Sequence, residues 1–206
     1  FRFQPTEPAK LVLVLYTARL AARCPTPGRL WRCFWPAALL MLVLFLQPDI
    51  GSALLCGAAA TALLVAAGLP LARLVPMVLA AGLFLFCAWL YLPHVAERFD
   101  RFWSPPPGSQ VGLSLTALGN GGLLGTGIGQ GMLKLGHLPK AGNDFIFAVV
   151  GEELGLVGTF SVLALLGLFG WFGFRTAAGC RDRFAVLAAF GLVFCIVLQG
   201  LAHVAV

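Results

Sequence analysis

The chain has 206 residues, of which 60% are hydrophobic and only 11% are charged, and its formal net charge is +6. A soluble domain carries roughly a quarter charged residues, so the composition excludes an ordinary soluble domain, and the high apolar content excludes a disordered chain. We therefore expect an all-α, polytopic membrane helix bundle that occupies residues 1–206. The chain begins with Phe1 rather than methionine, and we expect it to be part of a longer protein.

Six apolar runs are candidates for membrane spans, each of which needs about 20 apolar residues. In chain order they cover residues 8–22, 35–46, 50–69, 74–92, 145–174 and 184–204. The second run is short. The fifth is too long for one perpendicular span, so we expect a single helix that is tilted or projects from the bilayer.

A large loop, residues 93–143, separates the fourth and fifth runs. It contains three consecutive prolines at 105–107, ten glycines within residues 108–136, and no charged residue within 102–133. Loops of this length are either functional or disordered, and this one is too apolar for disorder. We expect it to dip into the membrane or lie along it, packed against the bundle.

The charged residues predict how the chain is oriented. Alternating the faces across six spans places eight arginines and one acid on one face, and six basic residues and seven acids on the other. The positive-inside rule makes the arginine-rich face cytoplasmic, so the large loop lies outside. The positive net charge is thus a topology signal, and nucleic-acid binding is not expected.

Carboxylates in or beside a bilayer are costly and mark candidate functional sites. Asp144, at the end of the large loop, is either a first-turn or N-cap acid or a general base at the membrane surface. Asp49 is either an N-cap or functional. Glu7 either forms a local ion pair with Lys10 at a helix start or is functional.

Glu152 and Glu153 follow Asp144 by two turns on the same predicted helix, roughly 12–13 Å deeper. They either support helix packing or serve the site. If they are buried, they must form ion pairs or take up protons.

Four cations flank the segment that ends at Asp144, namely Arg98, Arg101, Lys134 and Lys140. They either extend to the membrane edge or bind a substrate that carries phosphates and hydroxyls. The six cysteines and three histidines are scattered without paired spacing, so neither a disulfide framework nor a zinc site is expected. Nucleotide-binding motifs are also missing from the sequence.

Five motifs resemble the SEDS family (shape, elongation, division and sporulation) over nearly the whole chain. They are FQPTEPAK at 3–10, QPDIGSAL at 47–54, RFDRFW at 98–103, GSQVGLSL at 108–115 and LPKAGNDFIFAVVGEELG at 138–155. The last motif is long and highly specific, and Lys134 matches the lysine that precedes it. Gly151 before the two glutamates favours the division branch of the family over the elongation branch.

The resemblance implies a peptidoglycan glycosyltransferase that polymerises lipid II into glycan strands. It would act at the outer face of the bacterial cytoplasmic membrane, at the division septum. The implied partners are lipid II, polyprenyl-diphosphate-linked glycan, a class B penicillin-binding protein and the division machinery. A divalent cation, Mg²⁺ or Mn²⁺, is left open, and no other cofactor is implied.

The resemblance also assigns roles to residues. The family's essential aspartate falls on Asp144, which would act as the base. The substrate-binding candidates are Lys134, Arg98, Arg101, Gln110 and Lys140, and the supporting candidates are Glu7, Lys10, Asp49, Glu152 and Glu153.

Several positions depart from the family pattern. Lys140 stands where glutamate is usual, Gly142 and Asn143 replace His-Thr, Leu113 replaces a glutamine, and Pro8 replaces an aliphatic residue. Family members have ten spans, so we expect this chain to cover the fourth to the ninth and, alone, to lack a complete site.

Two other functions stay open. A lipid II flippase would also use membrane acids and a glycine-rich loop, but it needs polar groups along the translocation path. A non-catalytic scaffold for a class B penicillin-binding protein is favoured by the truncation and by the departures around Asp144.

Overall fold

The computed structural model describes residues 5–24, 26–47, 49–91, 96–97, 100, 110–131 and 146–205. The regular structure of these residues is helical, without a strand among them, as the composition predicts. The chain divides into two compact units. Unit 1 comprises Phe1–Leu79 and Gly167–Gly200, and unit 2 comprises Ala80–Leu166 and Leu201–Val206.

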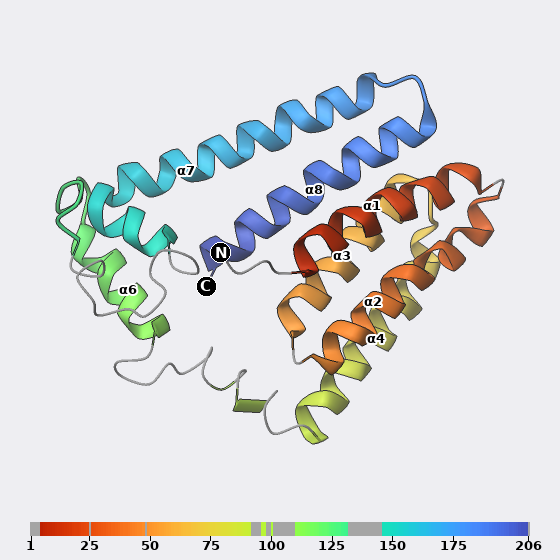
Figure 1. The fold of residues 1–206 in the computed structure, drawn as a ribbon, viewed down its shortest axis with the longest axis horizontal. Coiled ribbons are helices and arrows are strands. Elements are labelled where there is room, and N and C mark those ends of the chain that lie inside the picture. Colours follow the sequence, from red (N-terminus) through yellow and green to blue (C-terminus); the bar gives the residue numbers. More distant parts are fainter. Residues whose placement is uncertain are drawn as a thin grey trace. The chain divides into compact units, whose positions relative to one another are not determined.

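The helices follow the predicted apolar runs closely (Figure 1). They are α1 (Thr6–Arg23), the 3₁₀ helix η1 (Pro27–Phe34), α2 (Trp35–Leu46), α3 (Ile50–Ala66), α4 (Leu71–Tyr91), α6 (Gln110–Gly121), α7 (Ile146–Gly179) and α8 (Arg183–Ala205). The bounds predicted for the short second run are those of α2. Each helix begins or ends where an apolar run meets a charged residue, a proline or a glycine, because these residues cap a helix or interrupt it.

Three stretches of the described chain are long and apolar enough to cross a membrane: Arg29–Leu46, Ile146–Gly179 and Arg183–Val204. Ile50–Ala66 and Ala72–Leu83 are shorter apolar helices. α1 carries Glu7, Lys10, Arg19 and Arg23, which lower its hydropathy. The six predicted spans are therefore all helical, and three of them, among the residues that the structure describes, are long and apolar enough to cross a membrane.

Unit 1 is built on α1, α3 and the adjoining parts of α7 and α8. Its core contains Val14, Leu63 and Leu187, all almost completely buried. Gly191 of α8 lies so close to α1 and α3 that a Cβ atom there would be 2.7 Å from Val14 and 2.8 Å from Leu63. Small residues allow membrane helices to approach closely, so Gly191 sets the spacing of these three helices.

Six arginines lie at helix ends and in turns of unit 1, at the end where α1 and α3 finish and α8 begins. We call this the arginine end; it holds Arg23, Arg29, Arg32, Arg73, Arg181 and Arg183 at helix ends and in turns. The Arg183 guanidinium donates a hydrogen bond to the Ala67 carbonyl oxygen at 3.3 Å, which joins the start of α8 to the end of α3. Alternating spans predict this clustering, and the assignment of this end to the cytoplasm by the positive-inside rule stays a prediction.

Unit 2 contains a helix that the sequence did not predict. α6 lies inside the predicted loop, where glycines at 112, 119 and 121 obscure the helical pattern. Ala117 of α6 packs against Ala148 and Val149 of α7, and all three side chains are buried. Tertiary packing against α7 thus stabilises a helix of low intrinsic propensity.

α7 is two helices rather than the single one predicted. Gly155 has φ 65° and ψ −157°, a combination that only glycine adopts readily. A Cβ atom on Gly151 would lie 3.3 Å from the Thr159 Cγ2 atom, whereas eight residues of continuous helix rise about 12 Å. The chain therefore folds back at Gly155, and the extra length of the fifth run is a short helix (residues 146–154) before a long helix (residues 156–179).

Candidate functional site

Most of the residues predicted to act in catalysis and substrate binding lie outside the described structure. Asp144, Lys134, Arg98, Arg101 and Lys140 lie outside the described residues. Gln110 is the first residue of α6, and its side chain is likewise outside the description. Their predicted roles stay predictions.

The five supporting candidates are described, and they belong to two different units. Glu7, Lys10 and Asp49 are in unit 1, and Glu152 and Glu153 are in unit 2. The structure therefore brings Glu7 and Lys10 together in one group, and Glu152 and Glu153 together in another.

Glu7 and Lys10 form the predicted ion pair on the first turns of α1. The Lys10 Nζ atom lies 2.8 Å from Glu7 Oε1, and the side chains are 4% and 50% exposed, respectively. A buried ammonium group is costly unless it is paired and hydrogen-bonded. The local pair alone would leave Lys10 short of acceptors.

Gln199 of α8 supplies the missing partner, and sequence analysis did not identify it. Its Oε1 atom accepts a hydrogen bond from Lys10 Nζ at 2.9 Å, and its Nε2 atom donates to Glu7 Oε2 at 3.2 Å. The three side chains form a closed polar ring that joins α1 to α8. The signal was present as one amide within the apolar stretch 184–202, since buried amides almost always have hydrogen-bonding partners.

Asp49 is an N-cap, one of the two roles predicted for it. Its Oδ1 atom accepts a hydrogen bond from the Ser52 N–H at 3.2 Å, at the start of α3. The first amides of a helix have no partner within the helix, and a carboxylate there satisfies one of them and favours the helix dipole. The geometry assigns Asp49 a structural role.

Glu152 and Glu153 lie in the last turn of the short helix, where the chain reverses. Their side chains are only 2% and 7% exposed. A Cβ atom on Gly131 would lie 2.9 Å from Glu152 Oε2 and 3.2 Å from Glu153 Cγ, so the backbone at Gly131 passes directly over both side chains. The predicted packing role of Glu152 and Glu153 is supported. They pack where the short helix and the long helix of α7 meet, rather than along one continuous helix.

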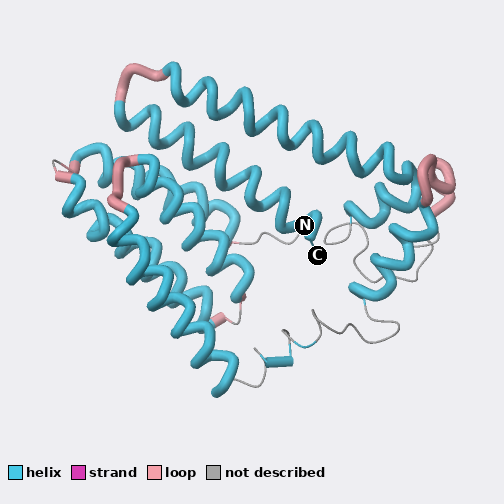
Figure 2. Tube along the Cα trace, turned by 180° about the vertical axis from the view of Figure 1, so that it is seen from behind, coloured by secondary structure: helices cyan, strands magenta, loops and turns pink. Residues whose placement is uncertain are grey.

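The segment after α6 satisfies the backbone at this reversal. We call residues 122–131 the glycine loop; it is drawn as a loop in Figure 2. At the end of the short helix, Thr126 N donates to the Glu152 carbonyl oxygen at 2.9 Å and Gly127 N donates to the Glu153 carbonyl oxygen at 3.1 Å. Helix ends leave such groups without partners, and water does not satisfy them within a membrane.

The same loop also satisfies the start of the long helix. Leu156 N donates to the Gly122 carbonyl oxygen at 3.0 Å, and Val157 N donates to the Leu123 carbonyl oxygen at 3.4 Å. The glycine loop therefore caps both helices at the break in α7. The prediction that the large loop packs against the bundle holds for this part of it, since these bonds join it to α7.

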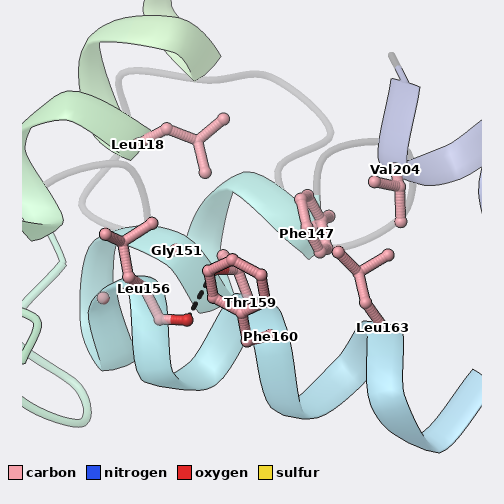
Figure 3. A pocket seen from close by; sticks show the side chains of 9 residues that line it. Leu118, Phe147, Gly151, Leu156, Thr159, Phe160, Leu163 and Val204 are labelled. Carbon is pink, nitrogen blue, oxygen red and sulfur yellow. Dashed lines mark hydrogen bonds between the residues drawn. The ribbon is translucent and has the colours of Figure 1, made fainter. Parts of the chain in front are cut away.

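A cavity of about 320 Å³ lies inside the fold-back of α7 (Figure 3). Its lining comes from α6, both parts of α7 and the end of α8: Leu118, Phe147, Gly151, Gly155, Leu156, Thr159, Phe160, Leu163 and Val204. The Thr159 hydroxyl donates to the Leu156 carbonyl oxygen at 2.9 Å and so is not available to a ligand as a donor. A cavity with such a lining suits a hydrocarbon chain and not a sugar or a phosphate.

Divalent cations such as Mg²⁺ prefer oxygen ligands, usually one or two carboxylates together with substrate phosphates and water. Within residues 5–131 and 146–205, less their gaps, no three His, Cys, Asp or Glu side chains are placed to hold one metal ion. Asp144 lies outside these residues, so the divalent cation stays a prediction.

Comparison with known proteins covers the whole chain. The family described as cell cycle protein, FtsW/RodA/SpoVE, matches residues 1–206. A probable peptidoglycan glycosyltransferase FtsW of Geobacter metallireducens is 34% identical over 100% of this chain and 58% of its own length. Stage V sporulation protein E of Bacillus subtilis is 32% identical over 100% of this chain and 59% of its own length.

A solved structure is also similar. It is described as "Structural coordination of polymerization and crosslinking by a peptidoglycan synthase complex", and one of its chains matches with a TM-score of 0.74 and 28% identity. The match covers 100% of this chain and 60% of that chain. The chain thus spans about three-fifths of the length of its relatives, and its helices and matches together identify a multi-pass membrane protein.

Proposed function

Because the chain belongs to the FtsW/RodA/SpoVE family of cell cycle proteins, we propose that the protein is a peptidoglycan glycosyltransferase. It polymerises lipid II into glycan strands at the outer face of the bacterial cytoplasmic membrane, at the division septum. The observation that carries the proposal is the match of all 206 residues to proteins named for this activity.

The reaction joins two sugars and releases a lipid diphosphate. Asp144 takes the proton from a hydroxyl of the acceptor sugar, and that oxygen attacks the anomeric carbon of the glycan carried on the lipid diphosphate. The bond between the anomeric carbon and the phosphate oxygen breaks, and the diphosphate leaves with the electron pair. Attack from the opposite face inverts the anomeric centre.

Cations bind the leaving diphosphate, whose negative charge increases as the bond breaks. Lys134, Arg98 and Arg101 take this role, and Gln110 and Lys140 contact the substrate. A divalent cation, Mg²⁺ or Mn²⁺, would share the charge of the diphosphate when bound.

The described residues supply the frame for this chemistry. The short helix begins two residues after Asp144, and the glycine loop holds its far end. The apolar cavity inside the fold-back of α7 would accept part of a polyprenyl chain. The penicillin-binding protein is proposed as partner because the similar solved chain comes from a complex of polymerisation and crosslinking.

Polymerisation of labelled lipid II tests the proposal, with the full-length protein and its cognate class B penicillin-binding protein. The parent should make glycan strands and Asp144→Ala should make none. Asp182→Ala is the matched control: this carboxylate accepts a hydrogen bond from the Ala185 amide at 3.0 Å at the start of α8, at the arginine end. It should retain activity.

Two results would overturn the proposal. Strands from Asp144→Ala at the parental rate would remove the base assignment. No strands from a folded, partner-bound parent would favour a flippase or a scaffold.

A further inference from the structure

One side chain adds a hydrogen bond to the backbone hydrogen bonds between the glycine loop and the short helix. The Thr126 hydroxyl donates to the Glu152 carbonyl oxygen at 3.0 Å, and the Thr126 N–H donates to the same oxygen at 2.9 Å. A carbonyl oxygen has two lone pairs, so it accepts both bonds together. Thr126 therefore holds the C-terminal end of the short helix through two donors.

The described apolar contacts of the short helix are of a different kind. Ala148 and Val149 pack against Ala117 of α6. Apolar contacts of small side chains are not directional, so they resist separation of the helices more than sliding along the axis. Hydrogen bonds weaken steeply when their distance and angle change. The two Thr126 bonds, together with the bond from Gly127 N to the Glu153 carbonyl oxygen, thus fix the axial position of the short helix.

The axial position of the short helix affects the residues at its other end, where the helix follows Asp144. The nine residues of the short helix rise about 13 Å as a rigid rod, so a shift at Glu152 is passed to the helix start. Asp144 precedes that start by two residues. A displacement of about 1 Å at a reacting group can lower a rate by about two orders of magnitude.

We propose that Thr126 is a positioning residue for glycosyl transfer: its hydroxyl, through the Glu152 carbonyl oxygen, sets the position of the helix that follows Asp144. The inference rests on the proposed function. This role is separate from capping. The backbone amides of Thr126 and Gly127 already cap the short helix, so the Thr126 hydroxyl is not needed as a cap.

The test compares variants of the full-length protein with its cognate penicillin-binding protein, with labelled lipid II as substrate. Thr126→Val keeps the shape and removes the hydroxyl, and it should lower kcat about tenfold with KM changed less than about twofold. Thr126→Ser keeps the hydroxyl and should retain most of the parental kcat.

Thr116→Val is the matched control within unit 2. The Thr116 hydroxyl donates to the Gly112 carbonyl oxygen of its own helix, α6, at 2.9 Å, and the residue is exposed. The control should change kcat less than about twofold, because its hydroxyl joins no second element.

Hydrogen–deuterium exchange supplies a readout that does not depend on activity. Thr126→Val should speed exchange of the amides of residues 150–154, and Thr126→Ser should not. If the parent polymerises nothing, the proposed function fails, and exchange still decides whether Thr126 holds the short helix.

Three results would overturn the inference: parental kcat and exchange in Thr126→Val, an equal loss in Thr116→Val, or no rescue by serine. If Thr126→Val does not accumulate as folded protein, Thr126→Ala takes its place, and activity is still expected to follow the hydroxyl.

Discussion

The ammonium group of Lys10 lies 2.9 Å from the side-chain oxygen of Gln199, although 189 positions separate the two residues in the chain. Lys10 is almost completely buried on α1, and Gln199 reaches it from α8. The amide also donates to Glu7, so one side chain contacts both members of an ion pair. This ring joins the start of α1 to the last turns of α8, at the end of unit 1 opposite the arginine end.

Replacing Gln199 with leucine should destabilise the protein. The change removes an acceptor from a buried ammonium group, which costs about 1–3 kcal/mol of unfolding free energy. Thermal unfolding of the full-length protein in detergent measures the loss. Gln130→Leu, the same change at an exposed amide of the glycine loop, is the control and should cost less than about 0.5 kcal/mol. Equal losses in the two variants would contradict the assignment.

The two members of the ion pair should respond unequally to mutation. Glu7→Leu leaves a buried cation with one fewer partner, whereas Lys10→Met leaves a carboxylate that is half exposed to solvent. An unpaired charge is costly where it is buried and cheap where water reaches it. We expect Glu7→Leu to cost about 1–3 kcal/mol and Lys10→Met about 1 kcal/mol or less. Denaturant titration of both variants measures the difference in unfolding free energy. A larger loss in Lys10→Met than in Glu7→Leu would contradict this expectation.

Replacing Gly155 with alanine should prevent normal folding of α7. Its φ of 65° disfavours any side chain, and a Cβ atom would lie 2.5 Å from the Gly125 nitrogen and 2.7 Å from the Leu123 carbonyl oxygen. The expected loss is about 3 kcal/mol or more, seen as a lower Tm or as failure to accumulate in the membrane.

Gly167→Ala is the matched control for Gly155→Ala. Gly167 lies within the long helix of α7, and a Cβ atom there would meet nothing within 4 Å. Alanine is the better helix former by about 1 kcal/mol, so this variant should be neutral or slightly more stable. Equal Tm values for the two variants would mean that the chain does not need to reverse at Gly155.

Removing the N-cap of α3 should have a smaller, well-defined effect. Asp49→Ala removes the acceptor for the Ser52 amide and should cost about 1 kcal/mol of unfolding free energy. Asp49→Asn keeps a side-chain oxygen and should cost only a few tenths of that. Urea titration of the two variants distinguishes them. A loss of polymerisation in both variants, with unchanged stability, would indicate that Asp49 acts in catalysis.

Much of the helical framework was predictable because the apolar runs are long and clearly bounded. The bounds of α2 were predicted correctly, since Trp35-Pro36 and Gln47-Pro48 bracket an uninterrupted apolar segment. The ion pair of Glu7 and Lys10 and the cap at Asp49 were also predicted, because both partners lie within one helical turn. Such local features depend on neighbours that the sequence itself displays.

The break in α7 was missed for the opposite reason. Gly155 is one of many glycines in apolar helices of this chain, and nothing local distinguishes it from Gly167. Its conformation is stable because the glycine loop, about thirty residues earlier, binds the amides and carbonyl oxygens that the break exposes. α6 was missed similarly, because its stability comes from packing on the short helix.

The sequence by itself determined that this protein is helical and membrane-embedded, and it predicted eight arginines with one acid on one face and six basic residues with seven acids on the other. Run length and charge position are properties of the chain alone, and the bilayer acts on them directly. Only the tertiary structure decided that Gln199 completes the pair of Glu7 and Lys10, and that Thr126 binds the carbonyl oxygen of Glu152. Both contacts join segments far apart in the chain, and their formation depends on how helices pack, which no local pattern encodes.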